Sequence, residues 1–358
     1  MGLALGELVH VFATDDCNCD CAFCFREFFS NNSESRLEEI AEILAKNKVK
    51  KVVIGGGEPT LVKNLDNVLG ILKKSNITTE LHTNGTKLNY KRLEHLKGLI
   101  DIFGIPIDTL DSRLQSELGR FGNHVEAIKR ISGEAQKLGF KIGYHTVATY
   151  LNVDKLPELY SGFIKNTDFE YWNVYEFNFN LARLGVFADV YSQKEKVCRY
   201  RELNELRGPL NFEKGLSDGL LAKFLLLEEM LTKKFGDSRM EFVDVLSSRA
   251  PYFFVNASGD VEFYTWFSQK RTKLGNLLED GFAKTVKKLR RANRQGPMFD
   301  QNEFVEATTD LPVFARLYEG NYSMEELDNI KPEYRQQVLH LAQLWEIKKY
   351  GIAQTTCF

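Results

Sequence analysis

Four cysteines crowd into eight residues of the 358-residue chain, in the stretch Cys-Asn-Cys-Asp-Cys-Ala-Phe-Cys at positions 17–24. Thiolates are soft ligands, and several of them on one short loop suit zinc or an iron–sulfur cluster. A structural zinc site usually takes its four ligands as two separated pairs. The two remaining cysteines, Cys198 and Cys357, stand alone. The stretch therefore favours an iron–sulfur cluster over structural zinc.

Within that stretch, Cys17, Cys21 and Cys24 have the spacing CxxxCxxC. Three thiolates on a four-iron cluster leave one iron without a protein ligand, and that iron can bind a small molecule. Cys19 lies between two of the expected ligands. We interpret it as a loop residue that points away from the cluster. The alternative is an adventitious ligand during cluster assembly or damage.

Six short β-rich runs that alternate with amphipathic helices must position this loop. Parallel strands joined by helices form an open sheet or a barrel, and we predict an α/β fold, a partial (β/α)6 TIM-like barrel. The expected strands cover residues 7–14, 51–54, 78–82, 101–107, 141–149 and 171–177. The expected helices lie near residues 35–46, 68–72, 90–96, 111–117, 125–138 and 153–164.

Four unusual loops follow the first four strands, and their sequences are CNCDCAFC, GGGEP, HTNG and DTLD. In barrels of parallel strands the chemistry takes place at the C-terminal ends of the strands. We therefore expect all four loops to lie on one face of the barrel.

The cysteine spacing, Phe23 before the last cysteine, the preceding strand and GGGEP at 55–59 together resemble the radical S-adenosylmethionine superfamily. The resemblance covers about residues 5–180. It implies one [4Fe-4S] cluster on the three cysteines, with S-adenosylmethionine on the open iron. It also implies that an electron from a flavodoxin- or ferredoxin-type donor splits this cofactor into methionine and a 5′-deoxyadenosyl radical, which abstracts a hydrogen atom from the substrate.

By the same resemblance, residues at the strand ends line the cofactor pocket. The glycines and the glutamate of GGGEP would hold the amino group of the cofactor, although a tight turn alone would explain the glycines. Thr83 and Asn84 would line the pocket, although Asn-Gly is also a common turn. Asp108 would contact the ribose or cap the next helix. The full set of implied cofactor contacts is Phe23, Gly56, Gly57, Glu58, Thr83, Asn84, Asp108, His145, Thr146 and Tyr175.

The order of LGRFGNHVEAI at 118–128, HTV at 145–147 and WNV at 172–174 resembles the viperin-like branch. Enzymes of that type dehydrate cytidine triphosphate and need cationic side chains at the phosphates. Where that pattern places lysine, this chain has Gly143 and Asn173. We therefore do not expect that reaction, and a nucleoside or phosphate-poor substrate stays open.

Residues 251–280 resemble the hairpin and turn of SPASM or twitch extensions. Those extensions usually carry cysteines for auxiliary clusters, and too few cysteines lie outside the first loop for that. We predict a hairpin at residues 252–265 that caps the open barrel without an auxiliary cluster, which leaves sugar-like and peptide substrates open. The predicted domains are a radical S-adenosylmethionine core at 1–182, a helical segment with a hairpin cap at 183–281 and a helical extension at 282–358.

Four further side chains are candidates for substrate chemistry. Cys357 is either a tail residue or a thiol that returns a hydrogen atom to a substrate radical. His10 either points into the barrel and touches substrate or is a satisfied core histidine. Arg26 and Arg120 would contact an anionic group near the mouth of the barrel, or form solvated salt bridges.

Composition narrows the function class. The 47 basic and 49 acidic side chains give a formal charge of −2, whereas a chain that tracks a nucleic-acid backbone usually has a basic excess. No apolar run approaches about eighteen residues and the first residues lack a signal-peptide pattern, so we expect a cytoplasmic protein without a membrane span. The sequence predicts a radical S-adenosylmethionine enzyme for a small-molecule or peptide substrate. The alternative is a non-catalytic iron–sulfur or zinc-binding scaffold protein.

Overall fold

The computed structural model describes residues 5–19, 21, 23–24, 36–149, 151–176, 231–243, 253–263 and 272–294. Contacts divide the chain into two compact units. The first consists of Met1–Cys198 and Asp237–Gly296, and the second of Arg199–Gly236 and Pro297–Phe358. All strands named below belong to the first unit. The predicted domain boundaries after residues 182 and 281 stay predictions.

Six parallel strands form the centre of the first unit and follow one another in sequence order across the sheet. This arrangement confirms the predicted partial barrel, and each strand begins and ends within two residues of its predicted bounds. The strands are β1 (Leu8–Thr14), β2 (Lys51–Gly56), β3 (Thr78–His82), β4 (Ile102–Pro106), β5 (Lys141–Ala148) and β6 (Phe169–Glu176).

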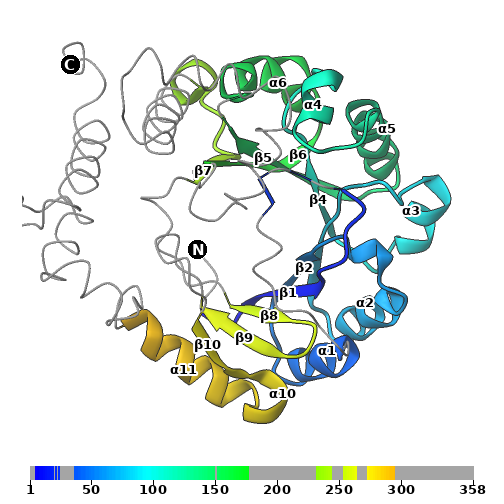
Figure 1. Ribbon diagram of the computed structural model, residues 1–358. Helices are drawn as coiled ribbons and strands as arrows, with labels where there is room; N and C mark the ends of the chain where they lie inside the picture. Colours follow the sequence, from blue (N-terminus) through cyan, green and yellow to red (C-terminus); the bar gives the residue numbers. More distant parts are fainter. Residues whose placement is uncertain are drawn as a thin grey trace, which may run out of the picture. The chain divides into compact units, whose positions relative to one another are not determined.

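Helices connect these strands and lie on the outer face of the curved sheet (Figure 1). Their inward apolar residues are buried; Leu37 and Ile40, for example, are each only 1% exposed. Burying one such side chain stabilises the fold by about 1.5–3 kcal/mol. The helices are α1 (Leu37–Lys46), α2 (Leu65–Lys74), α3 (Tyr90–Leu96), α4 (Ser112–Glu117), α5 (His124–Lys137) and α6 (Leu156–Gly162), with short 3-10 turns at Pro59–Leu61, Val153–Lys155 and Ile164–Asn166. Among the described residues, no helix is long and apolar enough to cross a membrane.

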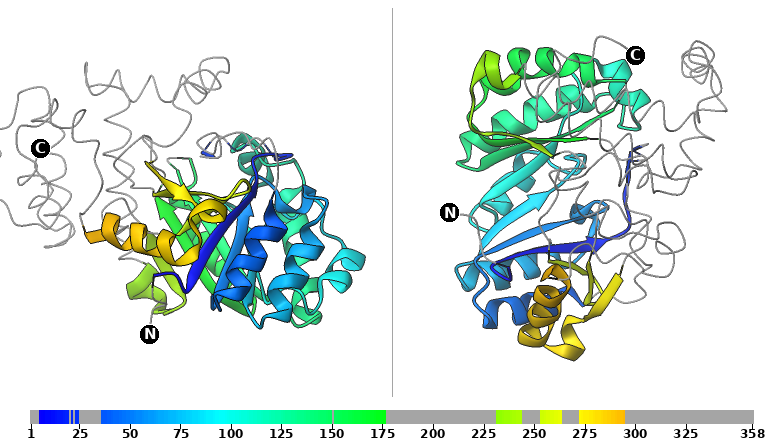
Figure 2. Two further views of the ribbon diagram at one scale, coloured as in Figure 1. Left: turned by 90° about the horizontal axis from the view of Figure 1, so that it is seen from below. Right: turned by 90° about the vertical axis from the view of Figure 1, so that its left-hand side faces the viewer.

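Four further strands extend the sheet at both edges. At one edge, β7 (Met240–Val243) pairs in parallel with β6. At the other, β8 (Phe254–Asn256) pairs in parallel with β1, and β9 (Asp260–Phe263) and β10 (Thr272–Asn276) continue antiparallel. The predicted hairpin is therefore present, and its first strand, β8, lies beside β1 in the same sheet (Figure 2). Helices α10 (Leu277–Asp280) and α11 (Phe282–Arg294) follow it.

Alternation along β5 and β6 decides which side chains face the barrel interior. Successive side chains on a strand point to opposite faces. The Trp172 ring stacks on Tyr160 of α6 with 5.5 Å between ring centroids, and its Nε1 donates to Thr146 Oγ1 at 2.9 Å. Thr146 and Trp172 thus face the helices, and the residues next to them, among them His145 and Tyr171, face the interior.

Candidate active site

The cysteine loop begins where β1 ends and lies directly against the end of β2. Gly57 N donates to Thr14 O at 2.6 Å, and Glu58 N donates to Asp16 O at 2.7 Å. The side chain of Thr14 accepts from Asp16 N at 3.0 Å. These bonds fix the first residues of the loop before its first cysteine.

Two glycines make that close contact possible. Gly56 has φ +114°, in a region that favours glycine, and a Cβ there would lie 2.5 Å from Thr14 O. A Cβ on Gly57 would lie 2.1 Å from Asp16 O. The immediate need for both glycines is therefore the backbone of the cysteine loop, which any side chain here would displace. Their predicted contact with the cofactor stays a prediction.

The Cys19 side chain lies within hydrogen-bond reach of the Cys17 and Cys21 side chains. Cys21 is buried, while Cys17 and Cys24 are partly exposed. Two N–H groups point at the Cys17 sulfur: Cys19 N at 3.4 Å and Asn84 Nδ2 at 3.7 Å. Cys24 N donates to Cys21 O at 3.0 Å, which closes a tight turn between two of the expected ligands.

Cys19 does not point away from the expected ligands, so that part of the sequence interpretation is wrong. Hydrogen bonds to Cys17 and Cys21, together with burial, raise the pKa of the Cys19 thiol. The hydrogen bond from Cys19 lowers the pKa of Cys21 against the effect of burial. The loop is so short that the Cys19 thiol is held beside those of Cys17 and Cys21.

Glu58 connects the end of β2 to the loop after β3. Its carboxylate is fully buried. Oε1 accepts from Thr60 N at 3.1 Å and from Thr83 Oγ1 at 2.7 Å, and Oε2 accepts from Asn84 N at 2.6 Å. Burial raises the pKa of Glu58, and these hydrogen bonds oppose that rise. Because Asn84 in turn donates to Cys17, Glu58 positions a residue that contacts an expected ligand.

Asp108 at the end of β4 belongs to a buried ion pair. Its Oδ2 accepts from Arg120 Nε at 3.2 Å, and its Oδ1 accepts from Val147 N at 3.0 Å. The N-cap of α4 is Asp111, whose side chain accepts from the backbone N–H groups of residues 113 and 114. The capping alternative for Asp108 is therefore wrong, because the cap lies three residues later.

Arg120 joins this ion pair to the cysteine loop. Its guanidinium carbon lies 5.3 Å from the centroid of the Phe23 ring, within the range of a cation–π contact. Burial disfavours the charged form, but the negative charges of Cys21 and Asp108 outweigh it and raise the pKa of Arg120. The side chain is only 9% exposed. Its predicted contact with a substrate anion stays a prediction. We call residues 15–19, 21, 23–24, 56–58, 83–84 and 108 with Arg120 the cluster rim.

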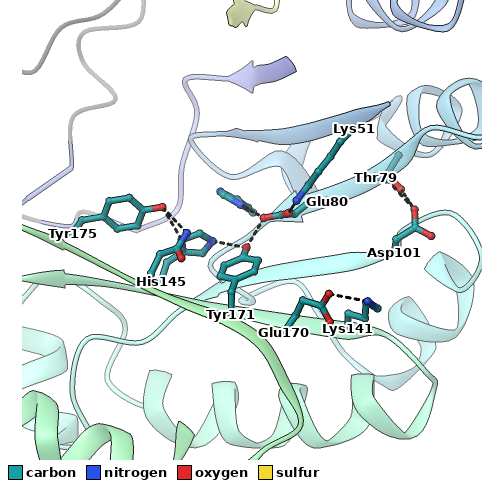
Figure 3. A network of polar contacts seen from close by, with 11 residues as sticks. Lys51, Thr79, Glu80, Asp101, Lys141, His145, Glu170, Tyr171 and Tyr175 are labelled. Atoms are coloured by element: carbon teal, nitrogen blue, oxygen red, sulfur yellow. Dashed lines mark hydrogen bonds and ion pairs between the residues drawn. The ribbon is translucent and has the colours of Figure 1, made fainter. Parts of the chain in front are cut away.

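A second group of polar side chains, the interior network, lies inside the barrel (Figure 3). Tyr175 OH and His145 Nδ1 are 3.3 Å apart, and His145 Nε2 is 3.0 Å from Tyr171 OH. Tyr171 OH donates to Glu80 Oε1 through a short hydrogen bond. The other side of the same carboxylate pairs with Lys51 Nζ at 2.5 Å. The network thus runs across four strands, from β6 through β5 and β3 to β2.

His82 completes the interior network. Its Nε2 is 2.6 Å from Glu80 Oε1, and its ring centroid is 4.2 Å from that of His145. Burial opposes ionisation of Glu80, but His82 and Lys51 outweigh it and lower the pKa of the carboxyl group. Burial and the nearby His82 hold the pKa of His145 well below its usual range. Burial also lowers the pKa of His10, on β1, to about 3.

His145 and Tyr175 of this network were predicted from the sequence as candidate site residues, whereas Glu80, Tyr171 and Lys51 were not. A signal was present, because Glu80 and His82 lie two residues apart on one strand and therefore share a face. Tyr171 and Tyr175 lie four residues apart on another strand. Polar side chains at such spacing on strands of a barrel interior indicate a site.

Thr146 lies on the helix side of β5, where its hydroxyl donates to Ile107 O at 2.5 Å and accepts from Trp172. Its predicted contact with the cofactor stays a prediction. Arg26 and Cys357 lie outside the described residues, so the expectations about them stay predictions as well.

Comparison with known proteins identifies the family of the region that carries the cluster rim and all of the interior network except its two tyrosines, Tyr171 and Tyr175. Residues 11–161 match the family model of the Radical SAM superfamily. A curated S-adenosylmethionine-dependent nucleotide dehydratase of Thermoplasmatales archaeon (strain ISO4-H5) is 27% identical over 137 residues, which cover 37% of this chain and 49% of the relative. A probable GTP 3′,8-cyclase of Pyrococcus abyssi is 29% identical over 157 residues, or 42% of this chain and 51% of the relative. The chain spans about half the length of these curated relatives.

A solved structure supports the fold independently of close sequence similarity. Native anSMEcpe with bound AdoMet and Cp18Cys peptide has a TM-score of 0.56 and 17% sequence identity, and the match covers 92% of this chain and 86% of that chain. The likeness shows that the two proteins share a fold. The resemblance inferred from the cysteine spacing and GGGEP is confirmed. Residues 11–161 of this chain therefore match the Radical SAM superfamily.

Proposed function

We propose that this chain is an enzyme that reductively cleaves S-adenosylmethionine at a [4Fe-4S] cluster and abstracts a hydrogen atom from a polar small molecule or peptide. The observation that carries the proposal is the three-cysteine loop. Its backbone is held by Gly57 and Glu58 at the C-terminal end of β2, the end at which barrels of this kind place their chemistry.

The residues of the rim fit an iron–sulfur cluster. Three thiols lie within eight residues, and the Cys17 sulfur already accepts from two N–H groups. Hydrogen bonds to sulfur are among the contacts that tune such clusters. When bound, the cluster would supply the electron that splits the sulfonium of S-adenosylmethionine.

The chain's own residues stabilise the charge and geometry of that rim. Arg120 places a buried positive charge beside Cys21, and this charge offsets part of the negative charge of the thiolates. Glu58 holds Asn84 in the position from which its amide reaches Cys17. We propose that Gly56, Gly57, Glu58, Thr83 and Asn84 bind the methionine part of the cofactor. A flavodoxin- or ferredoxin-type protein would supply the electron.

The interior network supports a polar, phosphate-poor substrate. Its groups are imidazoles, phenols and a carboxylate. Lys51 of the network and Arg120 of the rim already pair with Glu80 and Asp108. A triphosphate normally needs several cations at its oxygens. The named relatives act on nucleotides and the structural neighbour holds a peptide, so a nucleoside-like or sugar-like molecule and a peptide are the two substrate classes that we propose.

Anaerobic purification tests the proposal. After reconstitution with iron and sulfide and reduction with dithionite, the protein should turn S-adenosylmethionine into 5′-deoxyadenosine, measured by liquid chromatography. The triple change of Cys17, Cys21 and Cys24 to alanine should abolish both iron content and product. A colourless protein that holds zinc on these cysteines and forms no 5′-deoxyadenosine would instead support the scaffold alternative.

A further inference from the structure

Three ligand atoms of the interior network converge on one point between β3 and β5. The side chains of Glu80, His82 and His145 each offer one donor atom, and these atoms all lie within 4.8 Å of one another. Glu80 Oε1 and His82 Nε2 are already 2.6 Å apart. Two atoms bound to the same tetrahedral zinc ion are about 3.3 Å apart. Small rotations of the three side chains would therefore bring them to bonding distance from one cation.

Glu80 and His145 each make a second contact that fixes the orientation of the side chain. Glu80 Oε2 pairs with Lys51 Nζ, which leaves Oε1 directed toward the histidines. His145 Nδ1 contacts Tyr175 OH, which leaves Nε2 directed toward the same point. Metal-binding histidines and carboxylates in proteins typically have such a second contact, because it fixes their orientation.

A glycine on the strand between them makes room for this arrangement. Gly104 lies on β4, and a Cβ there would be 2.8 Å from both His82 Nε2 and His145 Nε2. The neighbouring Gly143, paired with Gly104 across the sheet, leaves space for the Tyr171 ring in the same way. Two adjacent strands thus lack side chains where the imidazoles and the phenol meet.

We propose that Glu80, His82 and His145 bind a divalent transition-metal ion inside the barrel, at a site separate from the cysteines. Two imidazoles and one carboxylate are ligands that suit zinc and ferrous iron. The cation would replace the proton shared by Glu80 and His82, and that proton would pass to solvent. Tyr171 OH, which lies within hydrogen-bond distance of Glu80 and His145, is placed to contact a water or substrate oxygen on the ion.

Zinc binding to the full chain tests the site directly. The protein, with its cluster reconstituted anaerobically, is dialysed against chelator, given zinc sulfate and desalted, and its zinc and iron are counted by mass spectrometry. We expect one zinc per chain beyond the cluster iron. Zinc-edge X-ray absorption should show only nitrogen and oxygen neighbours, because the proposed ligands contain no sulfur.

Matched variants locate the ion. H82A and H145A should each weaken zinc binding at least tenfold while iron content stays unchanged. H95A is the control, because His95 is an exposed residue of α3 that pairs with Asp66, and it should bind zinc like the unaltered protein. Circular dichroism checks that each variant is folded.

The proposal is overturned if the unaltered protein retains no zinc, if a zinc–sulfur distance of about 2.3 Å appears, or if folded H82A and H145A both keep full zinc affinity. None of these outcomes depends on cleavage of S-adenosylmethionine, so failure of this site and failure of the proposed function are distinguishable.

Discussion

The cluster rim and the interior network are both polar groups of the same barrel, but they are assembled differently. At the rim, a continuous loop is held by backbone hydrogen bonds to the next strand end, and glycines allow the contact. In the interior, single side chains from four strands meet. The geometry of the rim therefore depends on the conformation of the backbone. The geometry of the interior network depends on the register between the strands. Substitutions in the two regions should have different consequences.

The largest effect is expected at the rim cysteines. Cys21→Ala should abolish iron binding, because two remaining thiolates cannot hold a four-iron cluster stably. Iron analysis and visible absorbance measure the loss. Cys19→Ala is the matched control in the same loop and should retain iron. Full iron content in the Cys21 variant would remove the basis for the ligand assignment.

A large loss of stability is expected for the ion pair that supports the rim. Arg120→Met leaves Asp108 charged and buried without its partner, which should reduce the free energy of unfolding by about 3–5 kcal/mol. Denaturation followed by circular dichroism measures it. Arg113→Met is the control, since that side chain is 88% exposed, and it should change stability by less than about 0.5 kcal/mol. Equal effects in both variants would show that the pair contributes little.

A smaller loss is expected where the rim needs glycine. Gly57→Ala places a Cβ against Asp16 O and should reduce the free energy of unfolding by about 1–3 kcal/mol, together with iron content. Gly70→Ala in α2 has nothing within 4 Å of the new Cβ and should instead stabilise the protein by about 0.5–1 kcal/mol. Unfolding curves of the two variants measure these changes in the free energy of unfolding. Unchanged iron content in Gly57→Ala would argue against a rim that is held by its backbone.

The smallest effect is expected in the interior network. Tyr175→Phe removes the hydroxyl beside His145 and should cost about 0.5–1.5 kcal/mol, with iron content unchanged. Tyr90→Phe, at an exposed position of α3, is the control and should have no measurable effect on stability. If Tyr175→Phe lowered iron content as much as a rim variant, the two regions would not be independent.

Local patterns in the sequence predicted much of the fold. Short β-branched runs alternating with amphipathic helices indicated the parallel strands, and the bounds of β3 match the prediction. The hairpin was also predicted from its turn, but its pairing with β1 was not. Pairing between segments more than two hundred residues apart leaves no local pattern, so only the folded chain could show it.

Continuous motifs in the sequence predict the chemistry of the rim. The CxxxCxxC spacing and GGGEP are short continuous motifs. They can be recognised from the order of the amino acids alone. Other contacts are visible only in the folded chain: Cys19 lies beside two of the expected ligands, Arg120 pairs with Asp108, and Glu80 lies near His145. The physical reason is that such contacts join side chains from separate strands and loops, and parallel strand register brings them together.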